Sequence, residues 1–426
     1  MIAVALPGIV ADFGGSLASA TWLVTAYLIV MASVQPLAGK IGDGIGRRKL
    51  ILGSLVLFLA VSTGAALAPN IWVLLAFRVG QALAISVVLS NSFAVLRQVV
   101  PASRRGRTFG IIEGVTGLSA AAGPLVGGLL ITVTDWRAIF FVNIPVVLLA
   151  LIFAWRSLPR DSRRAEWREF DYIGAALLPA SLVSVAVFFL LLARGGEPLQ
   201  YVPVAIGAIA LSALLLKIEL AHPDPVIQPR LFKVRGFAAP SLGVGTSNLA
   251  MYSLLLVIPL MLVARGNFSP LEIGLILTSL TVGTALLSPI GGRMADRFGR
   301  RKPVVAGLLI TALATLIPAI SGSEVGVVPL IFGLGIVGLG LGLSNAGMRT
   351  SALESVPVRD AGSGAGTYST SRYLGSIIGS AMLAGLIGVD RSNTDGIGLV
   401  FIVVAAAAFA AVVAVSFMEA RPGTQD

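Results

Sequence analysis

Residues 39–49 read GKIGDGIGRRK, and residues 292–302 read GRMADRFGRRK. The two stretches align at a constant offset of 253 residues and share the pattern G-x-x-x-D-x-x-G-R-R-K. In this pattern the first glycine permits close approach of two helices, and the aspartate can accept hydrogen bonds from helix N-terminal amides or pair with an arginine. The second glycine permits a tight reversal of the chain. The recurrence predicts a chain of two related halves.

A loop that only anchors a membrane protein through its positive charge needs the arginines but neither the glycines nor the aspartate. The two copies therefore favour a functional loop, and we expect it to act as a gate between two states of the protein. The candidate gating residues are Gly39, Asp43, Gly46, Arg47 and Arg48 in the first copy, and Gly292, Asp296, Gly299, Arg300 and Arg301 in the second.

The composition around these loops is that of a membrane protein. The chain has 426 residues, of which 56% are hydrophobic and only 12% are charged. The net charge of +11 comes from short basic bursts separated by apolar stretches of roughly 20 residues, the length that crosses a bilayer as a helix. This spacing argues against a nucleic-acid partner. The absence of cysteine excludes disulfides, thiolate metal sites and cysteine nucleophiles, and we expect no metal site, no cofactor and no enzymatic activity.

The apolar stretches predict an all-α integral membrane fold with thirteen full spans. A partial first span is predicted over residues 1–10, which cover only about half a membrane. The expected full spans are 20–39, 50–68, 71–96, 108–132, 138–156, 172–193, 201–220, 238–264, 271–291, 303–321, 326–348, 365–389 and 397–418.

The positions of Lys and Arg predict the orientation, because cationic loops are retained in the cytoplasm. If residue 43 is inside, the inner loops and ends hold 25 Lys and Arg residues and the opposite loops hold 4. The two basic residues left over, Arg78 and Arg372, fall inside spans. This bias predicts a cytoplasmic C-terminus.

The chain resembles the major facilitator superfamily, whose signature loop joins the second and third helices and recurs in the second half. Within that superfamily it is similar to the fourteen-helix drug/proton antiporter branch, through Trp22–Tyr27 (WLVTAY), Trp136–Pro145 (WRAIFFVNIP) and Pro229–Phe232 (PRLF). The resemblance implies two six-helix lobes related by pseudo-two-fold symmetry, plus two extra connector helices. The implied divisions are an N-terminal lobe over 1–156, a connector over 157–235, a C-terminal lobe over 236–420 and a cytoplasmic tail over 421–426.

Small residues in the fifth span match the antiporter motif of this branch, and the resemblance implies an exchanger. Small side chains at this density form a smooth groove, and a proline removes a backbone donor, so the helix packs tightly yet bends. Ordinary tight packing explains the same residues equally well on physical grounds. The matching positions are Gly110, Ser119, Gly123, Pro124, Gly127 and Gly128, with Ser119 standing where glycine is usual.

Three charged residues within or near spans are candidates for proton coupling. Arg78 lies in RVGQ, which resembles the fourth-helix motif associated with proton coupling, and Arg372 in RYLG resembles the corresponding feature of the thirteenth helix. A charge within a span is functional by default unless it reaches the interface along its apolar stem. Glu113 could load and release a proton, or it could pair with Arg107 or Arg97 near the cytoplasmic end.

Polar residues within spans could line a translocation path, and interhelical hydrogen bonding explains each of them equally well. These candidates are Tyr27, Gln35, Asn91, Asn248, Tyr252 and Asn345. The resemblance implies a monomeric secondary transporter in a bacterial cytoplasmic membrane that exports small hydrophobic or cationic drugs or metabolites in exchange for protons. A dedicated metabolite exporter, a symporter and a non-transporting scaffold are the alternatives.

The resemblance also bears on the start of the chain. Family members carry an acidic residue in the first helix shortly before an Ala-Leu-Pro like that at residues 5–7. That position would precede Met1, so we expect either a start codon further upstream or a shortened form, and we favour the former.

Overall fold

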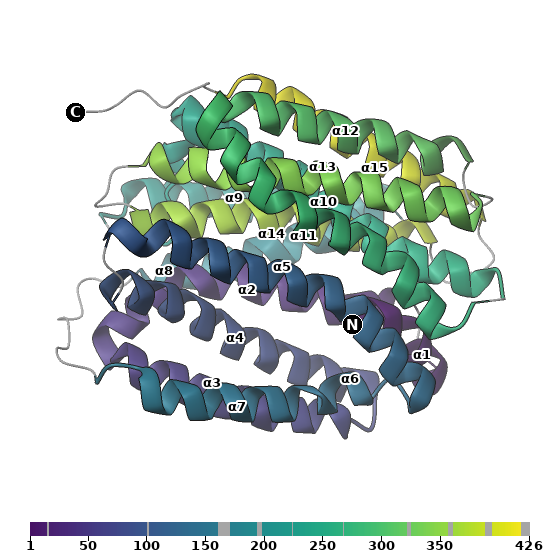
Figure 1. Ribbon diagram of the computed structural model, residues 1–426, viewed down its shortest axis with the longest axis horizontal. Helices are drawn as coiled ribbons and strands as arrows, with labels where there is room; N and C mark the ends of the chain where they lie inside the picture. The colour runs from purple at the N-terminus through teal and green to yellow at the C-terminus, as the bar shows by residue number, and fades with distance from the viewer. Residues whose placement is uncertain are drawn as a thin grey trace.

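The computed structural model describes residues 1–14, 17–99, 102–160, 171–193, 198–223, 225–266, 268–321, 325–356, 361–387 and 394–418. In these residues the chain is helical throughout, without strands, and the helices run side by side as a bundle (Figure 1). The helices are α1 (Ile2–Phe13), α2 (Leu17–Ile45), α3 (Arg47–Ala66), α4 (Ile71–Val99), α5 (Ala102–Val133), α6 (Ala138–Phe141), α7 (Asn143–Ser157), α8 (Tyr172–Ala193), α9 (Pro198–Ala221), the 3₁₀ helix η1 (Pro229–Lys233), α10 (Arg235–Ala264), α11 (Pro270–Phe298), α12 (Arg301–Ser321), α13 (Val327–Glu354), α14 (Ala361–Ile387) and α15 (Thr394–Ser416).

The all-helical membrane fold is confirmed, because eleven helices in the described residues are long and apolar enough to cross a bilayer. Helices α5 and α14 are the two predicted full spans not among them. They are 32 and 27 residues long, and part of each lies outside the residues whose side chains the structure describes. Within α5 only Ala122–Val133 counts as an apolar helix, as does the short α1. The total of thirteen full spans therefore stays a prediction.

The predicted span over 138–156 is divided into α6 and α7. The single residue between them, Val142, keeps a right-handed helical backbone, with φ −61° and ψ −23°, so the chain direction continues. Pro145 has no N–H and therefore leaves the carbonyl of Phe141 without its usual partner. The break between α6 and α7 is therefore a local loss of backbone hydrogen bonding, and the two helices continue in one direction.

The two halves of the chain repeat the same helix packing. In the first half α2 packs on α4, α3 packs on α4 and α7, and α1 packs on α5. In the second half α11 packs on α13, α12 packs on α13 and α15, and α10 packs on α14. Each of these contacts in one lobe thus has its counterpart in the other, as a parallel internal repeat requires. The molecule has the two-lobe architecture that the repeated loop predicts.

Glycines with positive φ mark equivalent helix ends in the two lobes. Gly46 (φ 106°) precedes α3 and Gly299 (φ 81°) follows α11, at the offset of 253 residues seen in the motif. Gly14 (φ 61°) ends α1, and Gly266 (φ 79°) follows α10. These are all the positive-φ residues in the described part of the chain. The prediction that the second motif glycine permits a tight reversal is confirmed.

In the second copy, the close approach predicted for the first motif glycine lies at the preceding residue. A Cβ added to Gly292 would meet Ala346 Cβ at 3.8 Å, an ordinary contact, whereas one added to Gly291 would lie 2.5 Å from the Leu343 carbonyl oxygen. In the first copy a Cβ on Gly42 would lie 1.7 Å from Asn91 Oδ1. In the second copy the close helix approach is provided by Gly291; in the first copy Gly42 makes such a contact, and the surroundings of Gly39 lie outside the described residues.

Glycines on two sides of α13 hold the second lobe together. Cβ atoms on Gly338 and Gly342 would meet the carbonyl oxygens of Leu280 and Thr284 in α11, at 2.0 and 2.4 Å. A Cβ on Gly340 would meet the Gly307 oxygen in α12 at 2.4 Å. Small residues let backbones approach in lipid, where apolar side chains gain little by leaving hydrocarbon for one another. Helix α13 is therefore clamped between α11 and α12.

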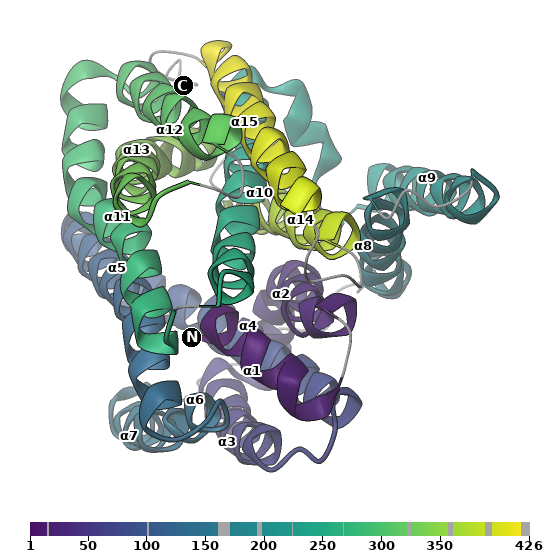
Figure 2. The same cartoon turned by 90° about the vertical axis from the view of Figure 1, so that its right-hand side faces the viewer.

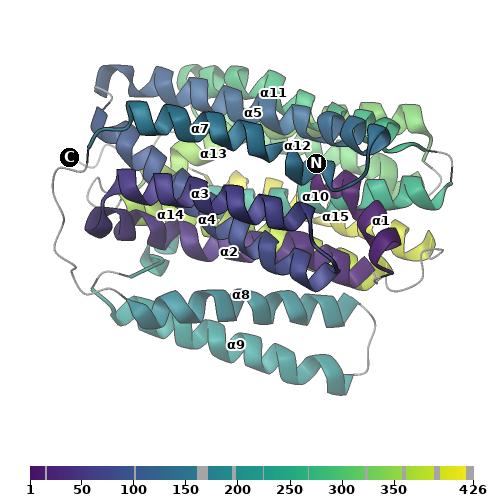
Figure 3. The same ribbon diagram turned by 90° about the horizontal axis from the view of Figure 1, so that it is seen from below.

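The two connector helices lie beside the lobes. Helix α8 packs against both α2 and α14, and α9 packs against α8. Figures 2 and 3 show this pair as a separate layer along one side of the bundle. The connector thus covers the contact between α2 of the first lobe and α14 of the second.

The positive φ of Gly46 generates a test of the repeated reversal. Gly46→Ala should destabilise the protein by about 1–2 kcal/mol, because a side chain disfavours this backbone region. Gly53→Ala is the matched control, since its Cβ would meet nothing within 4 Å and alanine is the better helix former. Thermal unfolding in detergent should show a lower Tm for the first variant only; equal Tm values would contradict the assigned strain.

Candidate functional site

Two helix pairs make most of the contact between the lobes: α2 with α14, and α5 with α11. Along the first pair the hydroxyls of Thr25 and Ser380 share a hydrogen bond of 2.7 Å. Further along, Thr370 Oγ1 donates to the carbonyl of Ala32 at 3.2 Å. The partners ascend in one helix as they descend in the other, so the two helices run antiparallel. This seam between the lobes carries polar groups over much of its length.

Arg78 lies beside the seam on α4, and its hydrogen bonds in the described structure go to neutral groups. Its Nη1 donates to Gln81 Oε1 at 2.9 Å and its Nε to the carbonyl of Leu23 at 3.3 Å. Gln81 Nε2 in turn donates to Ser62 Oγ at 2.8 Å. The guanidinium lies 4.2 Å from the centroid of the Tyr27 ring, a cation–π contact. The hydrogen-bond chain through α3 and α4 fixes where this charge sits.

Arg372 has the corresponding arrangement in the second lobe. Its guanidinium lies 4.7 Å from the Tyr373 ring centroid, and Nη2 donates to the Tyr373 hydroxyl at 2.9 Å. Gln35 of α2 donates to the same hydroxyl oxygen at 3.1 Å. The predicted residues Gln35 and Arg372 therefore meet at one tyrosine across the seam.

Tyr252 of α10 links the two arginines. It interacts electrostatically with Tyr373, Arg372, Tyr27 and Arg78, so groups from both lobes lie around it. Arg349 and Tyr368 lie within electrostatic range of Arg372 as well. We name Tyr27, Arg78, Tyr252, Arg372 and Tyr373 the central cluster.

The central cluster lies deep in the bundle and keeps accessible surface. Arg372 is 11 residues from the start of α14, which places it roughly 16 Å along a helix that is roughly 40 Å long. Tyr27, Arg78, Tyr252 and Arg372 are only half-buried, whereas Tyr373 is buried. Half-buried side chains at this depth fit a position facing space between the lobes.

The predicted asparagines differ from the cluster. Asn91 is fully buried, and its Nδ2 donates to the carbonyl of Ala38 at 2.9 Å, joining α4 to α2. Asn248 is buried and donates to Val244 of its own helix. Asn345 is half-buried on α13. The geometry of Asn91 and Asn248 is that of helix packing.

The antiporter-motif residues lie at the second seam. A Cβ on Gly128 would lie 2.5 Å from the Pro270 carbonyl oxygen, and one on Gly274 of α11 would lie 2.4 Å from the Pro124 oxygen. A Cβ on Gly127 would lie 2.8 Å from Met1 Cα, whereas Gly123 has more room, with Met1 N at 3.6 Å. Ser119, one to two turns away, is exposed. Pro124 and Gly128 thus meet the other lobe, whereas Gly123 and Gly127 lie against the start of the chain in their own lobe.

The motif arginines bind within their own lobes. Arg48 donates to the carbonyls of Trp155 and Leu158 at the end of α7. Arg300 pairs with Glu354, the last residue of α13. Both arginines close the bundle at the end where α3 and α12 begin, while Arg47 is half-buried and Arg301 exposed there. The side-chain environments of Gly39, Asp43, Asp296, Gly110 and Glu113 lie outside the described part of the structure.

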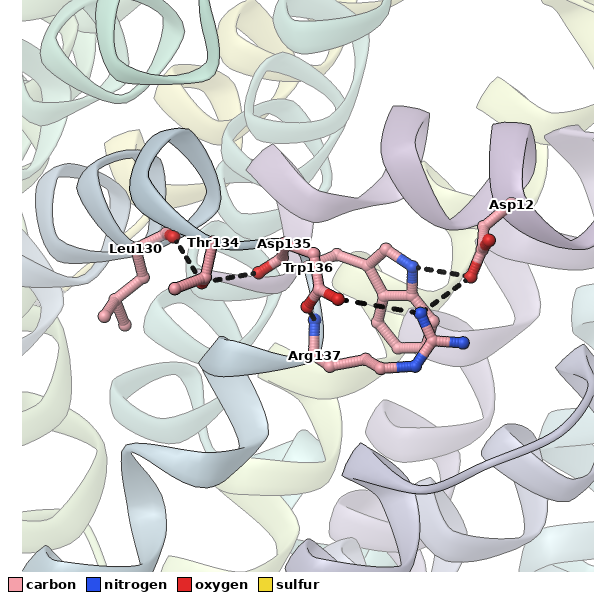
Figure 4. Close-up of polar contacts among 6 residues, drawn as sticks. All are labelled: Asp12, Leu130, Thr134, Asp135, Trp136 and Arg137. Atoms are coloured by element: carbon pink, nitrogen blue, oxygen red, sulfur yellow. Dashed lines mark hydrogen bonds and ion pairs between the residues drawn. The ribbon is translucent and has the colours of Figure 1, made fainter.

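An aromatic and ionic cluster fastens α1 at the opposite end of the bundle (Figure 4). Asp12 Oδ2 accepts from Arg137 Nη1 at 2.9 Å and from Trp136 Nε1 at 3.1 Å. Arg137 lies 4.4 Å from the Trp136 ring centroid and pairs more loosely with Asp135, at 3.8 Å. This cluster gives a structural reason for the Trp-Arg pair noted in the sequence.

Comparison with known proteins adds the family. The profile described as Major Facilitator Superfamily matches residues 1–220 and 241–426. The chain belongs to the Major Facilitator Superfamily. It is 35% identical over 387 residues to the uncharacterised MFS-type transporter YvkA of Bacillus subtilis, covering 91% of this chain and 86% of that protein. It is 32% identical over 403 residues to a multidrug resistance protein B homologue of Mycobacterium tuberculosis, covering 93% of this chain and 74% of the relative.

A crystal structure of the peptide transporter POT shows the same fold, with a TM-score of 0.69, 16% identity and coverage of 97% and 90% of the two chains. As a member of this superfamily, the protein is a membrane transporter and not an enzyme. Within it, the sequence indicated Arg78, Arg372 and Gln35 but missed Tyr373, Ser62 and Gly274, whose importance depends on contacts between distant segments.

The close approach at Gly274 predicts that the α5–α11 seam tolerates no added methyl group. Gly274→Ala should destabilise the protein by about 1–3 kcal/mol and impair transport, because the blocking atoms are backbone and have no room to yield. Gly335→Ala is the control, since its Cβ would meet nothing within 4 Å. Tm in detergent and transport in proteoliposomes measure both effects. If Gly274→Ala had the wild-type Tm and transport rate, the close packing of the α5–α11 seam would not be required for stability or transport.

The Asp12 contacts predict a small, specific loss. Asp12→Asn should lower the free energy of unfolding by about 0.5–1 kcal/mol, because the ion pair is partly exposed and weakened by solvent. Asp135→Asn removes the looser partner of the same arginine and should cost less. If the two variants have the same Tm, or Asp135→Asn the lower one, Asp12 does not fasten α1.

Proposed function

We propose that this transporter exports small molecules in exchange for protons by alternating access of the two lobes. The observation that carries the proposal is the central cluster, in which charged and aromatic side chains of both lobes meet deep in the helices. A site shared between lobes is exposed to one side or the other as the lobes rock. Multidrug-resistance names among the relatives support export.

The two seams support the rocking motion. The α5–α11 seam consists of glycine and proline backbone in close contact, and the α2–α14 seam of small polar groups. Short side chains offer little interlocking, so helices can tilt against one another. The pairing is symmetric, because the second helix of each lobe packs on the fifth helix of the other. Closure of one end and opening of the other can therefore proceed through small rotations about the same two contacts.

Proton coupling is assigned to Glu113, Arg78 and Arg372. Glu113 is the carboxyl that would take up the proton, and the two arginines would respond to its charge. The motif loops, with Asp43 and Asp296, would stabilise one of the two states. Arg48 and Arg300 support this role, since each ties the start of one helix to the end of another beside these loops.

We place the protein as a monomer in a bacterial cytoplasmic membrane, with the basic end of the bundle and the C-terminus in the cytoplasm. The biased distribution of Lys and Arg supports this orientation. The proton gradient is the energy source, and no cofactor is required.

A pH gradient should drive substrate movement in proteoliposomes. Protons entering down their gradient should move a substrate in the opposite direction, and an uncoupler should abolish the movement. Glu113→Gln should lower gradient-driven flux about 10-fold or more while leaving substrate exchange without a gradient intact. Uptake in the same direction as protons would show symport, and flux indifferent to the gradient would show that the protein is no proton exchanger.

A further inference from the structure

One turn of α2 and one turn of α14 are joined by two hydrogen bonds between the lobes. Pro36 has no N–H, so the carbonyl of Ala32, four residues earlier in α2, lacks its usual helical partner. Thr370 Oγ1 of α14 donates to this carbonyl at 3.2 Å. Three residues further along α14, the Tyr373 hydroxyl oxygen accepts from Gln35 Nε2 at 3.1 Å. The proline therefore leaves an acceptor in the first lobe, and a residue of the second lobe uses it.

Close packing holds these two turns beside each other. A Cβ on Gly366 of α14 would lie 3.1 Å from Pro36 Cβ, so the two helices approach closely there. Ser90 of α4 donates to the carbonyl of Gln35 at 2.8 Å, which binds this turn of α2 to its own lobe as well. The backbone on both sides of the seam is thus held by its neighbours, and the bond from Gln35 to Tyr373 is made at the tips of two long side chains.

Tyr373 makes two separate contacts with Arg372. The guanidinium lies 4.7 Å from the centroid of the ring, and its Nη2 donates to the hydroxyl oxygen at 2.9 Å. The Tyr373 side chain is buried, so the ring cannot turn away without displacing its neighbours. Its hydroxyl oxygen accepts one hydrogen bond from Arg372 of its own lobe and one from Gln35 of the other. The hydroxyl therefore connects the position of the charge to the position of the opposite lobe.

We propose that Tyr373 is a positioning residue, whose hydroxyl ties the Arg372 charge to Gln35 of the opposite lobe. Rocking of the lobes then changes the hydrogen bonds of Arg372, and a change in the charge near Arg372 in turn favours one arrangement of the lobes. This inference rests on the proposed exchange, in which Arg372 responds to the proton. It adds the contact through which that response reaches the other lobe.

A double-mutant cycle tests the contact between the lobes. Tyr373→Phe removes the hydroxyl and keeps the ring, and Gln35→Met removes the amide and keeps a side chain of similar length. Because both variants break the same hydrogen bond, the double variant should lose clearly less Tm in detergent than the two single variants lose together. Additive losses would show that the two side chains act independently and would overturn the proposal.

Transport in proteoliposomes tests the positioning role, with ethidium as a fluorescent probe of the hydrophobic cations expected from the sequence. Tyr373→Phe and Gln35→Met should each lower ethidium flux driven by a pH gradient about 5-fold or more, while exchange of ethidium without a gradient stays within about 2-fold. The reason is that the helix packing is kept, whereas the link between Arg372 and the opposite lobe is lost. An equal loss of both fluxes would show general damage to the protein and would contradict a positioning role.

Ser380→Ala is the matched control. It removes the hydrogen bond to Thr25 across the same seam, a bond that involves neither Arg372 nor Tyr373. This variant should lower the Tm but keep the wild-type ratio of gradient-driven to gradient-free flux. A change in the ratio equal to that of Tyr373→Phe would show that any bond across the seam has the same effect, and would refute the specific role of Tyr373.

The two measurements separate this inference from proton exchange. If ethidium flux in the unaltered protein ignored the gradient, the proposed exchange would fail, and a non-additive cycle would still establish the bond between Gln35 and Tyr373. If the gradient drove ethidium equally well in the unaltered protein and in Tyr373→Phe, exchange would stand and the positioning role would be refuted.

Discussion

Hydrocarbon offers no hydrogen-bond partner to a peptide group or a charge, and the structure of this transporter depends on that constraint. Backbone amides satisfy one another within helices, so the described chain is helical from end to end. The interruption at Val142 and the reversals at Gly46 and Gly299 occur where a helix can stop for one residue and resume. Because burying apolar side chains gains little in lipid, contact between helices must come from close packing of small residues and from hydrogen bonds.

The closest contacts between helices accordingly occur at glycine residues. Helix α13 meets α11 and α12 through glycines on two faces, and α5 meets α11 where neither helix has room for a methyl group. The same property serves two purposes. Inside a lobe, backbone contact makes a rigid unit; between lobes, it makes a smooth surface. The symmetry of the fold then supplies two such seams, and the central cluster lies beside one of them.

Charged groups also need partners within the protein, and the partners differ between the ends and the middle of the bundle. At the ends of the bundle, arginines find carbonyls and carboxylates: Arg48 at the end of α7, Arg300 at Glu354, and Arg137 at Asp12. Near the middle, Arg78 and Arg372 find tyrosines, amides and a carbonyl instead. Within the described residues, the ends of the bundle thus hold ion pairs, whereas the central arginines are held by aromatic rings and neutral hydrogen-bond acceptors.

The sequence by itself determined the class of the protein, because span length, the alternation of basic loops and the repeated motif depend only on residue order and on the thickness of a bilayer. It also indicated Arg78 and Arg372, since a charge in an apolar run is conspicuous. Only the tertiary structure decided what these residues contact. Gln35 and Tyr373 are 338 residues apart, and Gly274 meets Pro124 across two lobes, so no local pattern brings them together. Helix formation in lipid is a local matter and can be inferred from composition, whereas the environment of each charge depends on how separate helices pack.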